Sequence, residues 1–291
     1  MYYRTVNHPH GYFSTNESND FGFVRISKCG SNSFKQHFGL YKWVPFSQAS
    51  EFETLLCAIR NPFDRFLSSI PETLSRVRLP LSVHKIDMCF SGDVVVNPFV
   101  YERLRDLPKG EDAGSFLKGF IGIVEDFGFF DAHHEPIVNF LFDQKGEAQI
   151  NPQLFTLEDA NVVAALLPGY DSNSWRPKNV RKQKLQVESS NLFRRIKTFR
   201  RNLNLNERID VYPFDHPMVE FFPASQKSLS CDDIRIKRKL MDLYDELREC
   251  RREIWFQDFI QSHYARDLWL YENTTRKPER LEDLRLLSQL I

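Results

Sequence analysis

Two short hydrophobic runs stand out early in the chain, FGFVRI (21–26) and TLLCAIR (54–60). Runs of this length, rich in Phe, Val, Ile and Leu, are typical of interior strands of a parallel sheet, which are apolar on both faces. Each run is followed by loop residues and then by sequence compatible with a helix. In the second, Asn61 is a candidate N-cap and Pro62 suits the first helical position. Two consecutive strand–loop–helix units predict an α/β domain.

Apolar residues at helical spacing occur later in the chain. GSFLKGFIGIVEDFG (114–128) indicates a helix, although its glycines weaken the pattern. TLEDANVVAALL (156–167) has a strong helix start, with Thr156 as the N-cap and Asp159 three residues on. Residues 231–271 carry apolar side chains at helical spacing for most of their length. The sequence therefore predicts helices packed around the sheet.

The chain has no internal repeat and no clear linker, so a single domain over residues 1–291 is predicted. A chain of this length can bury a large core. Residues 23–70 would hold the two strands and the loops that follow them. Residues 71–112, rich in proline and charge, are expected to cross over the sheet, and the helices predicted in 71–291 would surround it.

Composition narrows the class of protein further. The 39 basic and 39 acidic side chains cancel, so the bulk charge indicates no polyanionic partner. The five cysteines are scattered and lack C-x-x-C spacing, which favours free thiols in a reducing compartment over a disulfide framework or a zinc site. No apolar run is long enough to span a membrane, and no signal-peptide pattern is evident. These features predict a soluble, cytoplasmic protein without a bound metal.

Candidate chemistry begins where the first hydrophobic run ends, at KCGSNS (28–33). Backbone N–H groups at a helix N-terminus and the helix dipole favour an anion. Gly30 would allow close backbone approach, Ser31 to Ser33 would add donors, and Lys28 would add a positive charge. The G-x-x-x-x-G-K-[ST] phosphate loop is absent. The alternative is that Lys28 is an ordinary surface lysine and the serines only cap a helix.

The second run ends in a comparable way. Arg60 follows the strand directly, and Ser68 lies eight residues on, within the predicted helix. An arginine fork and a hydroxyl at this place would suit a second phosphate group. The alternative is that Arg60 pairs with Asp64 and Ser68 is only a small helix residue. Behind two buried strands, the pair of loops favours an anion site.

Four segments together resemble the PAPS-dependent sulfotransferases of the Golgi carbohydrate sulfotransferase type. RISKCGSNS (25–33) is similar to that family's R-x-P-K-[small]-[small]-[ST]-x-[ST] pattern, and IRNPFDRFLSS (59–69) is similar to V-R-[DHN]-P-x-[ED]-R-x-x-S. FDAHHEP (130–136) resembles D-x-H-W-x-P, and YARDLWLY (264–271) resembles Y-x-x-D-x-x-L-[FY]. The segments occur in the family's order. The departures are Ser27 for the usual proline, His134 for the frequent tryptophan and Ile137 for the frequent glutamine.

This resemblance implies a three-layer, P-loop-like α/β fold with a central parallel sheet flanked by helices. It also implies transfer of a sulfuryl group from 3′-phosphoadenosine-5′-phosphosulfate (PAPS) to an acceptor hydroxyl, leaving adenosine 3′,5′-bisphosphate. Lys28 would contact the bridging oxygen, and Arg60 and Ser68 would hold the 3′-phosphate. The remaining residues that the resemblance implies for cofactor binding are Arg25, Cys29, Gly30, Ser31, Asn32 and Ser33. No metal is needed when lysine and a helix N-terminus supply the positive charge.

A hydroxyl acceptor needs a general base, and imidazole suits this role near neutral pH. His133 stands at the histidine of the D-x-H pattern, with Asp131 placed to orient it. The alternative is that 130–136 is a surface loop with solvated polar side chains. Other candidate bases, in decreasing order of preference, are His134 and Glu135, and then His37 and His84.

The acceptor is expected to be a carbohydrate, because the motif variants look most like carbohydrate sulfotransferases. Residues 176–201 hold ten Lys or Arg against one acid, Glu188. This stretch would attract an anionic acceptor, close over the cofactor, form a nucleic-acid surface or simply face solvent. Sparse aromatic residues there and the zero net charge argue against nucleic acid. A P-loop-like nucleotide enzyme of another class is the second alternative, disfavoured by the missing G-K-[ST] pair.

Overall fold

The computed structural model describes residues 11–76, 112–143, 145–175, 243–274 and 276–290, and five positions between 100 and 107. The described residues form two compact units. The sheet unit comprises residues 11–66, 133–175 and 257–290, and the helical unit comprises the other described residues, up to 132 and from 243 to 256. The single-domain assignment stays a prediction.

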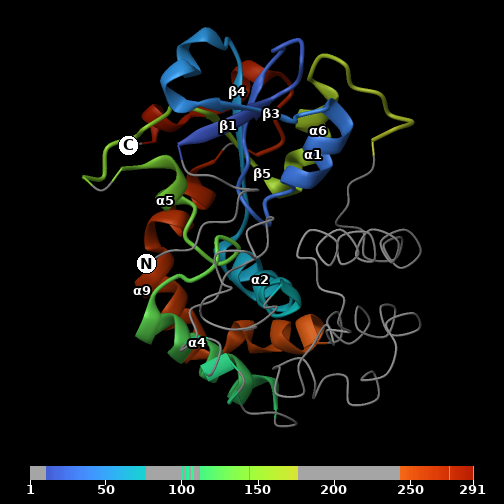
Figure 1. The fold of residues 1–291 in the computed structure, drawn as a ribbon. Coiled ribbons are helices and arrows are strands. Elements are labelled where there is room, and N and C mark those ends of the chain that lie inside the picture. Colours follow the sequence, from blue (N-terminus) through green and yellow to red (C-terminus); the bar gives the residue numbers. More distant parts are fainter. Residues whose placement is uncertain are drawn as a thin grey trace, which may run out of the picture. The chain divides into compact units, whose positions relative to one another are not determined.

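The described part of the sheet unit contains one six-stranded sheet in the order β3-β1-β2-β4-β5-β6 (Figure 1). Its three middle strands, β2, β4 and β5, pair in parallel, and the remaining pairings are antiparallel. The strands are β1 (Tyr12–Thr15), β2 (Gly22–Val24), β3 (Lys42–Pro45), β4 (Leu55–Ile59), β5 (Gln153–Thr156) and β6 (Arg285–Leu286). The predicted α/β class and parallel centre are confirmed, whereas the edges make the sheet mixed.

The antiparallel start of the sheet has a local cause. A short turn joins β1 to β2, and short connections allow only antiparallel pairing. Asn16 closes this turn, because its amide nitrogen donates to Asp20 Oδ2 at 2.7 Å and its amide oxygen accepts from the Asp20 N–H at 3.1 Å. Asn19 takes a left-handed conformation with φ of 55°. The first hydrophobic run is therefore the second strand of a hairpin as well as a neighbour of β4.

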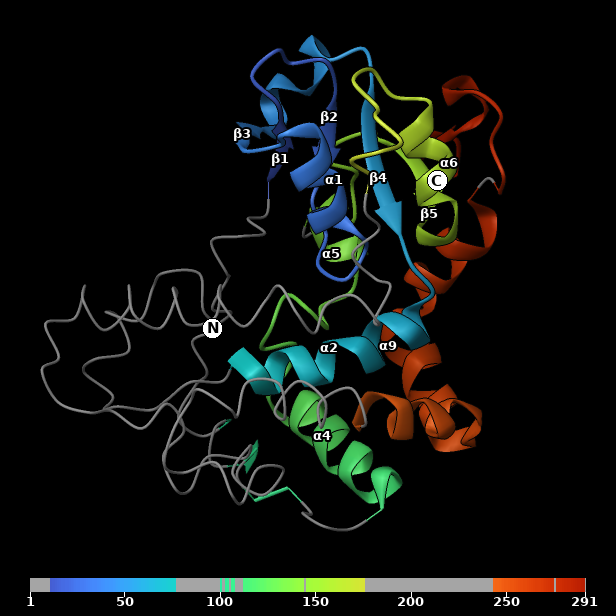
Figure 2. The same ribbon diagram turned by 90° about the vertical axis from the view of Figure 1, so that its right-hand side faces the viewer.

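Helices cover both faces of the sheet: α1 (Ser31–Phe38) and α6 (Ala160–Ala165) lie on one side, and α5 (Val138–Leu141) lies on the other (Figures 1 and 2). Phe34 fastens α1 to the sheet, because its ring stacks on Phe23 of β2 at 4.7 Å and meets Trp175 edge-on at 5.2 Å. Because helices cover both faces of the sheet, every residue of β2 and β4 is buried. This explains why both strands are apolar in sequence.

One of two predicted helix starts is confirmed, and the other is found in part. Asn61 Oδ1 accepts the Phe63 N–H at 3.0 Å ahead of α2 (Pro62–Arg76), which begins at proline. Thr156 Oγ1 donates to Asp159 Oδ2 at 2.7 Å, and a single 3-10 turn (Leu157–Asp159) leads into α6. Thr156 therefore pairs with Asp159 through the side chains alone and caps no main-chain N–H group, and the α-helix begins four residues after Thr156.

The other predicted helices are found in part. The pattern at 114–128 is confirmed as α4 (Ala113–Phe127) of the helical unit, where Asp112 Oδ1 accepts the Ser115 N–H at 2.9 Å. The glycines are tolerated because Phe116, Phe120 and other apolar side chains of α4 are buried. Within 231–271 the described helical residues include α9 (Ile254–Asn273), which kinks at Tyr264 with φ of −128°. Residues 231–242 lie outside the described residues.

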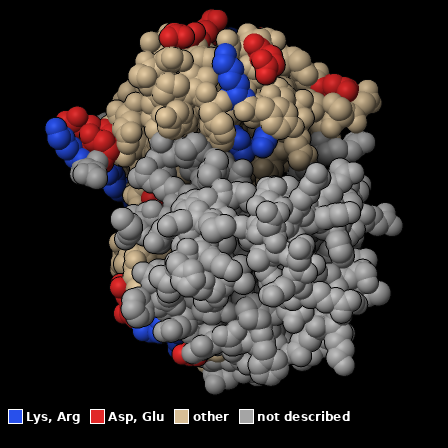
Figure 3. Space-filling view, in the orientation of Figure 1, with Lys and Arg blue, Asp and Glu red and all other residues tan. Residues whose placement is uncertain are grey.

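Charged side chains on the face shown in Figure 3 are mixed in sign over the described residues, as the balanced composition suggests. The basic stretch 176–201 and most of 71–112 lie outside the described part of the chain. Among the described residues, no helix is long and apolar enough to cross a membrane.

Candidate anion-binding site

The loops after β2 and β4 meet at the carboxyl edge of the parallel centre of the sheet. The two strands are neighbours in register, with Val24 opposite Cys57. Beyond their ends, Arg60 Nη1 donates to the main-chain oxygen of Lys28 at 3.3 Å. The predicted placement of Lys28 and Arg60 at one sheet edge is therefore confirmed. Ligands of open parallel sheets bind at this edge in general.

The first loop is tightly wound around Lys28. Lys28 has φ of 66°, and left-handed backbone costs a residue with a Cβ about 1–2 kcal/mol. The Cys29 N–H donates back to the Ile26 oxygen at 3.3 Å. Gly30 has φ of 75°, and a Cβ there would lie 2.6 Å from Leu157 Cδ1. Backbone strain of this kind clusters at ligand-binding loops, which favours a binding role for the loop.

The N-terminus of α1 lies directly behind this loop and has no side-chain cap. The N–H groups of Ser33 and Phe34 donate to the Gly30 main-chain oxygen. Among the described residues, the N–H groups of Ser31 and Asn32 have no acceptor, and the first turn carries no acidic side chain. An uncapped helix N-terminus is stabilised by an anion through its N–H groups and its dipole.

The remaining residues of the first loop differ in how they lie. Asn32 is exposed, whereas the side chains of Ser31 and Ser33 are largely buried. The Cys29 thiol is buried, and this burial raises its pKa to about 11, so Cys29 offers the site a main chain rather than a reactive side chain. Arg25 is buried too, with its guanidinium 4.6 Å above the Trp43 ring, and burial lowers its pKa to about 10.

Ser68 lies on α2 in the helical unit, and Lys28 and Arg60 lie in the sheet unit. Its assignment to the 3′-phosphate stays a prediction. The Arg60 guanidinium reaches the Lys28 loop. This contact does not test the alternative of a pair between Arg60 and Asp64.

A buried arginine that sequence reasoning did not single out fastens this loop from beneath. Arg65 is 1% exposed, and its Nε donates to the Ser27 main-chain oxygen at 3.1 Å. Its Nη1 donates to the Glu135 main-chain oxygen. The Arg65 charge also acts on the buried Asp267 carboxylate and favours its ionised form. One side chain therefore links three of the segments on which the sulfotransferase resemblance rests.

Two more buried side chains near Arg65, Tyr264 and Asp267, fix the segment that holds the candidate bases. Asp267 accepts the N–H groups of Ile137 and Val138 at 2.6 and 3.0 Å. Tyr264 donates its hydroxyl proton to the His134 main-chain oxygen. We call the set of buried side chains that tie these segments together the Arg65 cluster; it consists of Arg65, Tyr264 and Asp267.

The interpretation of 130–136 as an exposed surface loop is wrong. His133 is 4% exposed, His134 is 0% exposed and Glu135 is 6% exposed. Asp131, predicted to orient His133, accepts a hydrogen bond from Thr73 Oγ1 at 2.7 Å. Within the sheet unit, the Arg65 cluster binds the main-chain oxygens of His134 and Glu135.

His37 is tied to a different loop. Its Nε2 accepts the Asp171 N–H at 3.2 Å, and its ring meets Trp175 edge-on at 5.1 Å. These contacts give His37 a role in packing α1 against residues 171–175. His84 lies outside the described residues.

The pKa of Asp267 is raised from 3.8 to about 6, first by burial, while Arg65 and the two N–H groups oppose that rise. A carboxyl that is easier to protonate in the folded state stabilises folding at low pH and loses this contribution as the pH rises. Between pH 4 and pH 7 the loss amounts to about 2 kcal/mol. We expect Asp267→Asn to flatten that part of the stability profile, measured by urea unfolding at several pH values. An unchanged profile would contradict this.

Comparison of the chain with protein-family models, with curated proteins and with solved structures found no significant match in any of the three. Among the described residues, no group of three or more His, Cys, Asp or Glu side chains is arranged to hold a metal ion. The functional assignment therefore depends on the residues and their geometry.

Proposed function

We propose that the chain is a PAPS-dependent sulfotransferase that sulfates an acceptor hydroxyl. The observation that carries this proposal is the contact between the Lys28 and Arg60 loops at the end of two adjacent parallel strands. A single bisphosphate nucleotide must contact both loops, and a hydrogen bond joins the two loops directly. The uncapped N-terminus of α1 beside Lys28 adds the donors that a phosphosulfate needs.

In this proposal the reaction is an in-line displacement at sulfur. The bond between sulfur and the bridging oxygen breaks, a bond forms between sulfur and the acceptor oxygen, and adenosine 3′,5′-bisphosphate leaves. Lys28 would offset the charge that builds up on the bridging oxygen, and the N–H groups of Ser31 and Asn32 would hold the 5′-phosphosulfate. Arg60 would bind the 3′-phosphate with Ser68. The acceptor proton would pass to His133.

The acceptor proposed is a carbohydrate hydroxyl, and this choice is supported by the motif resemblance alone. Incubation with PAPS labelled at sulfur across a panel of neutral and anionic glycans tests it. Transfer to none of them would leave small molecules, lipids and tyrosine peptides as acceptors. A gel shift with DNA and RNA on the same preparation tests the nucleic-acid-binding alternative.

Calorimetry with adenosine 3′,5′-bisphosphate and with AMP tests the cofactor. We expect the bisphosphate to bind more tightly, because the Arg60 loop would contact its extra phosphate. Arg60→Ala should remove most of that preference, at a cost of about 1.5–3 kcal/mol for a charge-assisted contact. Arg285→Ala, which removes an exposed arginine from the edge strand β6, is the matched control and should leave both affinities unchanged.

Two outcomes would overturn the proposal. Equal affinity of the parent protein for the bisphosphate and AMP would show that no 3′-phosphate site exists. Preferred binding of ATP with magnesium would instead support a nucleotide enzyme of another class.

A further inference from the structure

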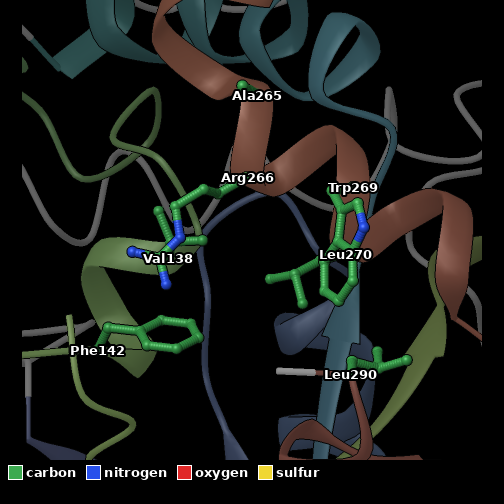
Figure 4. Close-up of a pocket in the computed structure, with 7 residues that line it drawn as sticks. All are labelled: Val138, Phe142, Ala265, Arg266, Trp269, Leu270 and Leu290. Atoms are coloured by element: carbon green, nitrogen blue, oxygen red, sulfur yellow. The ribbon is translucent and has the colours of Figure 1, made fainter.

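The sheet unit contains a hollow that is lined by residues other than those of the Lys28 and Arg60 loops. It has a volume of about 320 Å³ and is lined by Val138, Phe142, Ala265, Arg266, Trp269, Leu270 and Leu290 (Figure 4). Six of these residues are apolar, and the seventh is a cation. Trp269 is 43% exposed, so an aromatic surface is open to solvent at this hollow. The volume is at the lower end of the range for small-molecule sites, about 300–1,000 Å³.

Arg266 lies in this hollow with one side of its guanidinium covered. Its central carbon lies over the Phe142 ring, 4.3 Å from the ring centre. Figure 4 shows the two side chains side by side. Stacking uses the flat face of a guanidinium, and its N–H donors lie in the plane and stay available. Among the described residues, no hydrogen bond or ion pair engages the Arg266 guanidinium. The hollow therefore joins apolar walls to a cation with open donors.

The nearest turn does not supply an anion for Arg266. A Cβ on Gly146 would lie 3.8 Å from Arg266 Nη1, so the guanidinium lies over the 143–147 turn. Asp143 is used inside this turn, where its Oδ1 accepts the N–H groups of Lys145 and Glu147, each at 2.9 Å. Among the described residues the Arg266 charge acts on the adjacent Asp267 carboxylate, but the oxygens of Asp267 accept the Ile137 and Val138 N–H groups, so the Arg266 donors stay available to a group from outside.

The two walls of the hollow are also held in place. Asp267, next to Arg266, accepts the N–H groups of Ile137 and Val138, and so fastens α9 to the start of α5. Pre-organised walls reduce the entropy that a ligand must give up on binding.

We infer that this hollow binds a small aromatic carboxylate, with the ring between the apolar walls and the carboxylate on Arg266. Aromatic walls such as Phe142 and Trp269 favour a flat ring over an alkyl chain. A planar guanidinium matches a carboxylate through two parallel hydrogen bonds. This site does not depend on the sulfotransferase proposal.

Calorimetry with 2-naphthoate tests the inference, with 2-naphthalenemethanol as the neutral analogue. We expect naphthoate to bind more tightly than the alcohol. Arg266→Gln should weaken naphthoate binding about tenfold, as for an exposed charge-assisted contact, and leave the alcohol unaffected. Trp269→Ala should weaken both ligands.

Arg276→Gln is the matched control, because Arg276 stacks at 4.3 Å on Tyr271 outside the hollow and lies 4.0 Å from Glu158. It should leave naphthoate binding unchanged. The inference would be overturned by no binding of naphthoate, by equal binding of acid and alcohol, or by equal losses with Arg266→Gln and Arg276→Gln. Displacement of naphthoate by adenosine 3′,5′-bisphosphate would place it in the loop site and would also overturn it.

Discussion

Replacement of His133 by alanine is expected to lower turnover by roughly 10²–10⁴-fold, the range for loss of a general base. His133 is 4% exposed, and the chain just after it is fixed by the bonds from Ile137 and Val138 to Asp267. A base held in this way would meet the acceptor hydroxyl with little loss of entropy. Affinity for adenosine 3′,5′-bisphosphate should change little. Single-turnover rates with labelled PAPS and a competent acceptor measure the effect.

His134→Ala is the matched control. The His134 ring is fully buried, 6.3 Å edge-on from Phe66, and its main-chain oxygen accepts the Tyr264 hydroxyl. We therefore expect this variant to lower thermal stability while the rate per folded molecule stays within a few-fold. A larger rate loss with His134→Ala than with His133→Ala would shift the motif alignment by one residue.

Wild-type turnover should also fall in the acidic range, because only neutral imidazole accepts a proton. A flat rate profile together with full activity of His133→Ala would place the base elsewhere. His37 is then a weak candidate for the base, because its Nε2 already accepts the Asp171 main-chain N–H. His84 would be the next residue to replace.

The parallel centre of the sheet was predictable because β2 and β4 are apolar on both faces, a pattern that few other elements share. The antiparallel edges were not. β1 (YFST) and β3 (KWVP) are short and mixed in polarity, and they become strands through their pairing with one another, as at Phe13 with Val44. Propensity in such segments is weaker than tertiary context.

The meeting of Lys28 and Arg60 was predictable for a geometric reason. Parallel neighbours end at the same edge, so residues that directly follow two such strands come together whatever their own side chains do. The burial of the Cys29 side chain was not predictable, because the tight turn with Lys28 at φ of 66° decides which side chains point inward.

Arg65 shows why the rest of the site was missed. A charged residue on a helix normally indicates a solvent-exposed face, and its partners are far away in sequence. Two of its acceptors are the Ser27 and Glu135 main-chain oxygens, 38 and 70 residues away. Main-chain acceptors leave no side-chain signature in the sequence, so only the folded chain reveals why a cation is buried there.

Arg65→Met is expected to reduce the free energy of unfolding at pH 7 by about 3–5 kcal/mol, the usual cost of removing one partner from a buried charge cluster. Methionine fills much of the arginine's volume, so the loss would come from polar groups. The Ser27 and Glu135 oxygens would lose a donor, and the Asp267 carboxylate would lose the charge that favours its ionised form. Urea unfolding at constant pH measures the difference.

The double variant Arg65→Met with Asp267→Asn separates charge from packing. Once Arg65 is replaced, the Asp267 carboxylate is a buried charge without compensation, and Asp267→Asn removes it. Asp267→Asn should therefore cost less free energy of unfolding in the Arg65→Met background than in the parent protein. A double-mutant cycle measures this difference as coupling. Arg285→Met, an exposed control, should stay within about 0.5 kcal/mol of the parent. Strictly additive effects would show that Arg65 and Asp267 act independently. In that case Arg65 would stabilise the Lys28 loop through its main-chain bonds alone, and the cluster would not link that loop energetically to the His133 segment.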